Sequence, residues 1–220
     1  MSTTSSNQPN SLLSAAGLFC ERDDRVLFEN LGFSLEEGEV LQVKGSNGSG
    51  KTTLLRIVCG FNDAFEGDLY WRGTPIRQQR EEFCASVLYM GHRVGINKIL
   101  TPLENLRWIC SLRSPATDTA ILKALNTLGL RGYEDSPCHN LSAGQQQRVS
   151  LARLLINPAR LWVLDEPFTT LDVHGVADLE RMLADHTAGG GSVLVTTHHK
   201  LQVAGELRYL NLDDNISKRQ

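Results

Sequence analysis

The segment GSNGSGKT, residues 45–52, constrains the fold more than any other part of the chain. It fits the pattern GxxxxGK[ST], in which a glycine-rich turn joins a strand to a helix and binds phosphate. Short apolar runs separated by turn residues fill 25–45, and this pattern predicts strands. Residues 52–60, TTLLRIVCG, have helical spacing and end at Gly60. The order of strand, glycine loop and helix therefore predicts a phosphate-binding loop.

The chemistry of such a loop assigns roles to its residues. Backbone N–H groups surround phosphate oxygens only where no side chain obstructs them, and the following helix presents its positive end to the same anion. We expect Lys51 to reach the β and γ phosphates of a nucleotide and Thr52 to ligate Mg²⁺. The predicted nucleotide-binding residues are Gly45, Ser46, Asn47, Gly48, Ser49, Gly50, Lys51, Thr52 and Thr53.

A second motif, LWVLDEP at 161–167, predicts a buried strand that ends in two acids. Its carboxyl end should lie at the same edge of the sheet as the phosphate loop. We expect Asp165 to hold Mg²⁺, through water, and Glu166 to act as the general base for an attacking water. Two adjacent acids at a strand end are also typical of a solvated turn, but the nearby phosphate loop favours the catalytic interpretation.

The chain alternates strands and helices, which favours a parallel sheet with crossover helices. Within about 95–157 the pattern is helical: Thr101, Pro102 and Glu104 predict a capped helix start, and 118–130 repeats apolar residues at helical spacing. From 161 we expect a strand, a helix around 176–186, a glycine turn and the strand SVLVTTHH at 192–199. Residues 1–11 are polar and predicted to be disordered, and 12–220 to form a single domain.

The segment LSAGQQQR, residues 141–148, resembles the LSGGQ signature of ATP-binding cassette (ABC) ATPases, with Ala143 in place of a glycine. The resemblance implies an α/β P-loop NTPase fold of the ABC type. Its core is a mainly parallel sheet, with antiparallel strands near the N-terminus and a helical insertion that carries the signature. It also implies that Ser142, Gly144 and Gln145 bind the nucleotide held by a second copy of the chain.

Two later motifs extend the resemblance to ABC ATPases. TTLD at 169–172 is similar to the family's D-loop, with Asp172 near the dimer contact. His198, in TTHH at 196–199, is identified as the histidine that contacts the γ phosphate, and His199 is the alternative.

The sequence departs from the ABC family at two places. His92, in GHRVGIN, occupies the position of the family's Q-loop glutamine, which contacts Mg²⁺ or the attacking water. Imidazole can also donate to or accept from these groups, so we interpret His92 as a working substitute. Replacement by glutamine should keep activity and flatten its pH dependence, since only imidazole changes charge near neutral pH. The ABC family usually has an aromatic ring that stacks on adenine, and its position falls near Arg22 in this sequence. The guanidinium plane of Arg22 can stack on a base, and Phe19 can approach it.

Several segments together resemble one subgroup, the ATP-binding subunits of cytochrome c biogenesis, or haem export, systems. They are CERDDRVLF at 20–28, GSNGSGKTTLLR at 45–56, GHRVGIN at 91–97, LTPLENL at 100–106 and LSAGQQQRVSLARL at 141–154. The resemblance implies an ATPase, using ATP and Mg²⁺, that is peripheral to the cytoplasmic face of the bacterial inner membrane. Its implied partners are integral membrane subunits of a cytochrome c maturation complex and a second copy of itself.

Other functions fit the sequence less well. A different transported substrate is the main alternative, and the moved species is either haem or a haem-loaded chaperone. A soluble ABC ATPase of the nucleic-acid-associated kind should show two fused cassettes or a long coiled coil. A small-molecule kinase would leave the signature unexplained. The net charge of −3 and the lack of a basic patch predict that nucleic acid is not a partner.

Cysteine usage and hydropathy agree with an intracellular chain. The five cysteines include no CxxC pair, so we expect buried or partly buried thiols in a reducing compartment. The apolar stretch at 12–19 is too short and interrupted to cross a membrane or to direct secretion.

Overall fold

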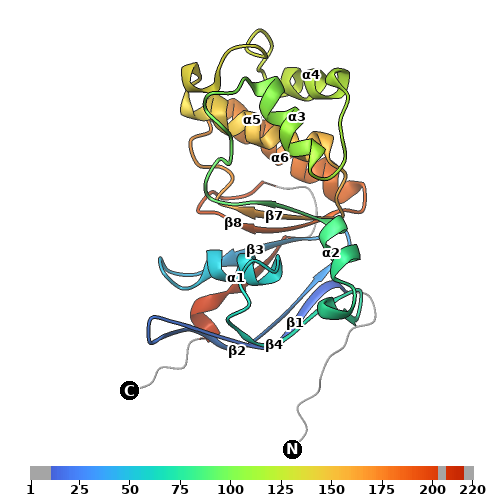
Figure 1. Cartoon of the computed structure of the whole chain (residues 1–220). Coiled ribbons are helices and arrows are strands. Elements are labelled where there is room, and N and C mark those ends of the chain that lie inside the picture. Colours follow the sequence, from blue (N-terminus) through green and yellow to red (C-terminus); the bar gives the residue numbers. More distant parts are fainter. Residues whose placement is uncertain (1–10, 203–206, 216–220) are drawn as a thin grey trace, which may run out of the picture.

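The computed structural model describes residues 11–202 and 207–215, which form two β-sheets and a group of helices (Figure 1). The predicted disordered start, residues 1–11, lies outside the described residues except for Ser11. That residue instead begins the first strand and pairs with Glu36.

The central sheet has five strands in the order β6-β7-β8-β3-β9, and every neighbouring pair is parallel. This confirms the predicted parallel sheet, and it places the phosphate loop, which follows β3, beside the ends of β8 and β9. The strands are β3 (Val40–Lys44), β6 (Val87–Met90), β7 (Leu161–Asp165), β8 (Ser192–Thr196) and β9 (Leu207–Asn211).

Both faces of this sheet are covered, as the mostly apolar strands β6, β7 and β8 require. In β7, Leu161 and Val163 belong to one buried cluster, which also contains residues of α1 (Lys51–Val58) and of the antiparallel sheet. The alternate residues Trp162 and Leu164 belong to a second cluster, formed with the helices above the sheet. Because side chains of a strand alternate between faces, one short strand contributes to both cores.

The second sheet is antiparallel, with the strand order β2-β1-β4-β5, and it confirms the antiparallel strands expected near the N-terminus. The β1–β2 connection turns at Asp23 and Asp24, which both have positive φ (52° and 58°). Aspartate tolerates this left-handed backbone better than most residues, so a two-residue turn is possible here. The strands are β1 (Ser11–Arg22), β2 (Arg25–Glu36), β4 (Glu66–Trp71) and β5 (Thr74–Pro75).

The helical insertion between β6 and β7 lies within the predicted range, 95–157. Thr101 caps its first helix: the Thr101 hydroxyl accepts the N–H of Glu104, and the Glu104 carboxylate accepts the N–H of Thr101. The predicted capping box is therefore confirmed. The insertion contains α3 (Pro102–Ser111), α4 (Asp118–Thr127) and α5 (Ala143–Ile156); α2 (Arg80–Ser86) precedes β6 and α6 (Val173–Ala188) follows β7.

Besides Ser11, two predictions differ from the structure. The strand expected over 192–199 ends at Thr196, because the Thr197 hydroxyl accepts the N–H of His199 and turns the chain. Of the five cysteines, all of them free thiols, four are buried as expected, but Cys84 is exposed.

None of the helices within the described ranges has the length and apolar composition needed to cross a bilayer.

One buried histidine predicts how stability depends on pH. The ring of His186 stacks on Trp162 with 3.8 Å between ring centroids, and burial lowers the pKa of His186. The unfolded chain therefore binds a proton that the folded chain does not, so the free energy of unfolding should fall as the pH drops below about 6.5. His186→Phe keeps a flat ring on Trp162 but cannot titrate. Its loss of stability between pH 7 and pH 5, measured by urea unfolding, should be smaller than that of the wild type.

The control for this measurement is His174→Phe, in the exposed first turn of the same helix. Between pH 7 and pH 5 that variant should lose as much stability as the wild type. An equal loss in the wild type and in His186→Phe would contradict the assignment.

Candidate functional site

The phosphate loop runs from the end of β3 to the start of α1. At two of its positions, Gly45 and Gly50, a side chain would clash with neighbouring atoms. At Gly45 (φ 151°) a Cβ would come within 2.4 Å of the Ser49 hydroxyl. Gly50 (φ 98°) caps α1, and a Cβ there would lie 3.0 Å from the Cβ of Leu27. Only glycine allows the loop to close this tightly while its N–H groups point toward an anion.

Lys51 lies over this loop, as the sequence predicts for a phosphate-binding lysine. Its ammonium donates hydrogen bonds to the carbonyls of Gly45 (2.9 Å) and Ser46 (3.0 Å). Two neutral carbonyls are modest partners for a full positive charge, so the ammonium retains the capacity to bind phosphate oxygens.

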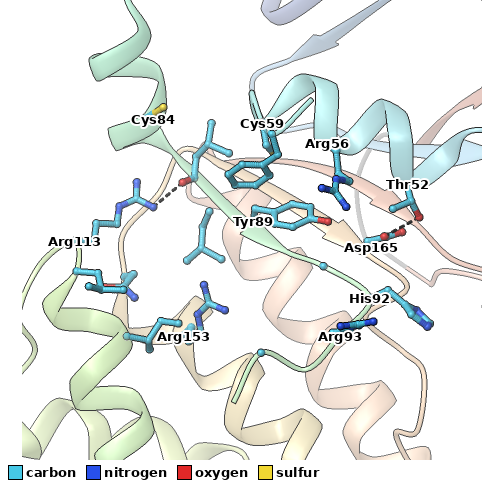
Figure 2. A pocket seen from close by; sticks show the side chains of 18 of the residues that line it. Thr52, Arg56, Cys59, Cys84, Tyr89, His92, Arg93, Arg113, Arg153 and Asp165 are labelled. Carbon is cyan, nitrogen blue, oxygen red and sulfur yellow. Dashed lines mark hydrogen bonds between the residues drawn. The ribbon is translucent and has the colours of Figure 1, made fainter. Parts of the chain in front are cut away.

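Asp165 is held by hydroxyl groups on both of its carboxylate oxygens (Figure 2 shows the bond from Thr52). Thr52 donates to Oδ2 at 2.9 Å, and Thr196 donates to Oδ1 at 2.7 Å. The carboxylate is only 2% exposed, so these bonds fix its orientation. The two predicted magnesium ligands, Thr52 and Asp165, are thus brought into direct contact.

Glu166 follows Asp165 in a backbone conformation that is costly for a glutamate. Its φ is 52°, and its N–H is held by both the carbonyl and the hydroxyl of Thr196, each at 3.0 Å. Non-glycine residues in this region are strained, and such strain clusters at functional sites. The conformation directs the carboxylate toward His198, with 3.6 Å between Oε1 of Glu166 and Nε2 of His198.

The two candidate histidines differ in their surroundings. His198 is exposed and lies beside Glu166 at the phosphate site. His199 contacts Glu180 of α6 at 3.0 Å and packs against the ring of Phe168. The geometry therefore favours His198 over His199 for the γ-phosphate contact, as the sequence did.

One cleft of about 690 Å³ is lined by Lys51, Thr52, Asp165, Glu166 and His198. His92 also lines it, as does the β1–β2 turn with Arg22, Asp23 and Arg25. Phe19 does not line the cleft; it lies further along β1, opposite Glu66 of β4. Of the two side chains predicted to stack on the nucleotide base, only Arg22 lines the cleft. Arg25 also lines it and was not predicted from the sequence.

The signature residues Ser142, Gly144 and Gln145 do not line this cleft. Ser142 and Gln145 instead form a reciprocal cap at the start of α5, each side chain accepting the other's N–H. At Gly144 a Cβ would lie 2.9 Å from the carbonyl of Thr170, so the signature packs directly against the segment TTLD. The structure thus separates the signature from the phosphate loop of its own chain.

An ion pair joins the signature helix to the predicted D-loop. Arg148 of α5 pairs with Asp172, which also caps α6 by accepting the N–H of Gly175 at 2.8 Å. The bond from Gly175 and the Arg148 guanidinium lower the pKa of the Asp172 carboxyl. This ion pair therefore ties α5 to the start of α6.

Two further residues at the site were not predicted. The Thr196 hydroxyl contacts both Asp165 and the N–H of Glu166. The contact depends on the parallel register that pairs Thr196 with Asp165, and the sequence alone does not reveal that register. Asp213, in the 3₁₀ turn η3 (Leu212–Asn215), accepts the N–H of Ser46 at 2.9 Å and its hydroxyl at 3.0 Å. No motif marks this acid.

Comparisons with known proteins agree with these features. The family model described as ABC transporter matches residues 28–169. A cytochrome c biogenesis ATP-binding export protein, CcmA, of Hahella chejuensis is 53% identical over 201 residues, covering 91% of this chain and 95% of the relative. The protein of the same name from Methylococcus capsulatus is 50% identical over 201 residues, covering 91% and 97%.

Solved structures show the same fold. A putative ABC transporter ATP-binding protein of Pyrococcus furiosus has a TM-score of 0.79 at 23% identity, covering 93% of this chain and 99% of its own. A dimeric ATP-binding cassette in a post-hydrolysis state, bound to ADP and Pi, has a TM-score of 0.75 at 22% identity. It covers 85% of this chain and 88% of its own.

The contact of Asp213 with the loop predicts a measurable effect on nucleotide binding. Asp213→Ala removes every hydrogen bond that this carboxylate makes to Ser46, so the loop loses order before it binds phosphate. We expect KM for ATP to rise roughly ten-fold, with a smaller change in kcat, since bonds to a charged acceptor are worth about 1.5–3 kcal/mol. Steady-state hydrolysis kinetics would measure both constants.

Asp213→Asn keeps an acceptor oxygen, so its KM for ATP should lie between those of the wild type and of Asp213→Ala. Asp214→Ala changes the neighbouring exposed acid and should match the wild type. A wild-type or lower KM in Asp213→Ala would show that the contact does not order the loop.

Proposed function

Because the chain belongs to the ABC transporter family and, within it, to the cytochrome c biogenesis ATP-binding export proteins, we propose that its ATP hydrolysis drives haem handling in c-type cytochrome maturation. The chain is an ATPase of the ABC type. The observation that carries the proposal is the identity of about half of all residues, over nearly the whole length, with relatives of that one name.

In the proposed reaction the phosphate loop binds the triphosphate. Its N–H groups and the positive end of α1 surround the β phosphate, and Lys51 moves from the loop carbonyls to the β and γ oxygens. Arg22 and Arg25 lie where the base would extend from the loop, and a guanidinium plane can stack on it.

The residues beside the loop fit a magnesium ion. Mg²⁺ prefers oxygen ligands and is usually bound by one or two carboxylates together with the substrate's phosphates. Thr52 and Asp165 supply a hydroxyl and a buried carboxylate within 2.9 Å of each other, which suits that ion. When bound, the ion would neutralise charge that develops on the phosphate oxygens.

Glu166 is the proposed general base. Water attacks the γ phosphorus, the bond from that phosphorus to the β–γ bridging oxygen breaks, and the Glu166 carboxylate accepts the proton of the water. His198, 3.6 Å from Glu166, would donate to a γ-phosphate oxygen and hold it during the attack. His92, which lines the same cleft, would orient the water as the family's glutamine does.

A second copy of the chain would complete this site. Ser142, Gly144 and Gln145 lie outside the cleft of their own chain, and the start of α5 is a helix N-terminus suited to an anion. The dimeric cassette of similar fold supports a head-to-tail pair in which each signature closes over the partner's nucleotide.

The proposed membrane partners are integral subunits of a cytochrome c maturation complex, which the chain would contact from the cytoplasmic face of the bacterial inner membrane. Support comes from the relatives, which are named as export proteins. Export requires a path through the bilayer, and dimer closure would supply the mechanical work to that path.

The role of Glu166 is tested with its amide. Glu166→Gln keeps the size of the side chain but removes its ability to take a proton, so kcat should fall about 10²–10⁴-fold. Binding of ATP, followed with a fluorescent analogue, should remain near the wild-type affinity. Lys51→Ala is the contrasting variant, since it should weaken binding itself. Full turnover by Glu166→Gln would rule out the assigned role.

The cellular function is tested in a strain whose only copy carries Glu166→Gln. Haem staining and absorption spectra of its membranes should show loss of c-type cytochromes while b-type cytochromes remain. A second strain with Asp214→Asn, an exposed acid away from the cleft, should keep both. Normal c-type cytochromes in the first strain would refute haem handling and favour another transported substrate.

A further inference from the structure

A separate cavity of about 360 Å³ adjoins the nucleotide cleft. The two share Lys51 and His198, and the other residues that line this cavity do not line the cleft. Those residues come from β3 and the start of the phosphate loop, from the segment that follows β8, and from β9. The cavity therefore extends from the two side chains assigned to the γ phosphate toward β9, the edge strand of the central sheet.

Basic side chains line this cavity, and none of its lining residues is an acid. Among the described residues no carboxylate forms an ion pair with any of its three lysines. A cavity lined by one sign of charge concentrates ions of the opposite sign, so this one attracts anions. We call it the basic cavity; its basic side chains are Lys44, Lys51, His198, His199 and Lys200.

Lys44 is held in place without being neutralised. Its Nζ lies 3.4 Å from the centroid of the Tyr209 ring. The face of an aromatic ring attracts a cation but carries no net charge that would cancel it. The backbone pairing of Lys44 with Asn211 of β9 fixes the end of β3 as well. Lys44 therefore offers a positioned cation to an anion in the cavity.

The segment after β8 is tied to β3 by hydrogen bonds of its own. The buried amide of Gln42 donates to the carbonyl of Thr197 at 2.9 Å, and the Thr197 hydroxyl accepts the N–H of His199. These bonds fix the turn that carries His198 and Lys200. The basic side chains of the cavity thus project from a braced backbone on both sides.

Hydrolysis leaves phosphate beside the two residues that the cavity and the cleft share. In the reaction set out above, ADP still occupies the phosphate loop at that moment, and the signature of a second copy covers the cleft. Phosphate that left through the cleft would have to pass both. The basic cavity begins at the same two side chains, Lys51 and His198, and avoids this obstacle.

The outer cations suit passage more than retention. Lys44 and Lys200 are exposed, so water and salt screen their charges. Ion pairs of such exposed lysines are weak. An anion that reaches them is therefore attracted from the cleft and then lost to solvent.

We propose that the phosphate released by hydrolysis leaves through the basic cavity, from Lys51 and His198 past Lys44 and Lys200, while ADP remains in the phosphate loop. This exit path rests on the proposed ATPase reaction, in which Lys51 and His198 hold the γ phosphate. It does not depend on haem handling.

Rapid mixing measures the exit of phosphate directly. The full chain is loaded with ADP, Mg²⁺ and inorganic phosphate, then mixed with an excess of a fluorescent phosphate sensor that captures each ion as it leaves. Lys44→Glu and Lys200→Glu each place a negative charge in the path. Release should become about ten-fold slower in both variants, at the lower end of the rate effects of charge-lined clefts.

Cleavage of ATP by the same variants, followed by acid quenching in a single turnover, should keep the wild-type rate. Slower cleavage with unchanged release would assign the cavity to the chemical step and overturn the exit path. Unchanged release in both variants would refute it outright.

The matched control is Lys123→Glu in α4, at an exposed lysine outside both cavities, which should release phosphate at the wild-type rate. High salt should bring the release rate of Lys44→Glu closer to that of the wild type, because salt screens exposed charges. A slower release that salt does not change would indicate altered packing and contradict an electrostatic path.

A lipid headgroup is the other source of phosphate chemistry. Sedimentation of the full chain with vesicles that contain or lack phosphatidylglycerol tests this source. The wild type and Lys44→Glu should bind each kind of vesicle equally. Binding of the wild type to the anionic vesicles that Lys44→Glu loses, with phosphate release unchanged, would assign the cavity to a lipid and overturn the exit path.

The result is separable from that for the cellular function. Normal c-type cytochromes in the Glu166→Gln strain, together with slower release in Lys44→Glu, would refute haem handling but leave the exit path intact. Lost c-type cytochromes with unchanged release would do the reverse.

Discussion

The parallel pairing of β7, β8 and β3 is the constraint on which the site depends. Register places Thr196 directly opposite Asp165, and the Thr196 hydroxyl donates to that carboxylate while it accepts the N–H of Glu166. Because parallel strands all end at the same edge, the phosphate loop after β3 meets these groups without any long connection. A slip of one residue in β8 would turn Thr196 to the other face and leave Asp165 without one of its two hydroxyl donors.

The sequence predicted the parts of this site that are local. The phosphate loop, the two acids at the end of β7 and the Thr101 cap depend on residues within a few positions of one another, so spacing alone reveals them. Thr196 and Asp213 could not be predicted in the same way, because their partners lie 31 and 167 residues away in the chain. The end of β8 was misplaced for a related reason: a single hydroxyl, that of Thr197, ends the strand inside an apolar run that continues the β pattern.

The signature lies outside the cleft that contains the phosphate loop of its own chain, and it packs against the segment before α6. Gly144 contacts Thr170, and Arg148 pairs with Asp172, so α5 and the segment before α6 behave as one unit. Thr170 itself has a φ of 70°, a strained conformation for a β-branched residue. A signature that closes on a partner's nucleotide would pull on this unit, and the strain makes the segment a natural place for a change of conformation.

A groove of about 940 Å³ between β6 and the helices α3 and α5 adjoins the nucleotide cleft, and both are lined by Thr52, His92 and Asp165. β6 ends at Met90, His92 follows two residues later, and the ring of Tyr89 packs over Gly91. Burial and the charge of Asp165 raise the pKa of Tyr89 to about 12, so this phenol stays neutral between groove and cleft. His92 follows β6 and lines both cavities, so a displacement of β6 would change the nucleotide cleft through this residue.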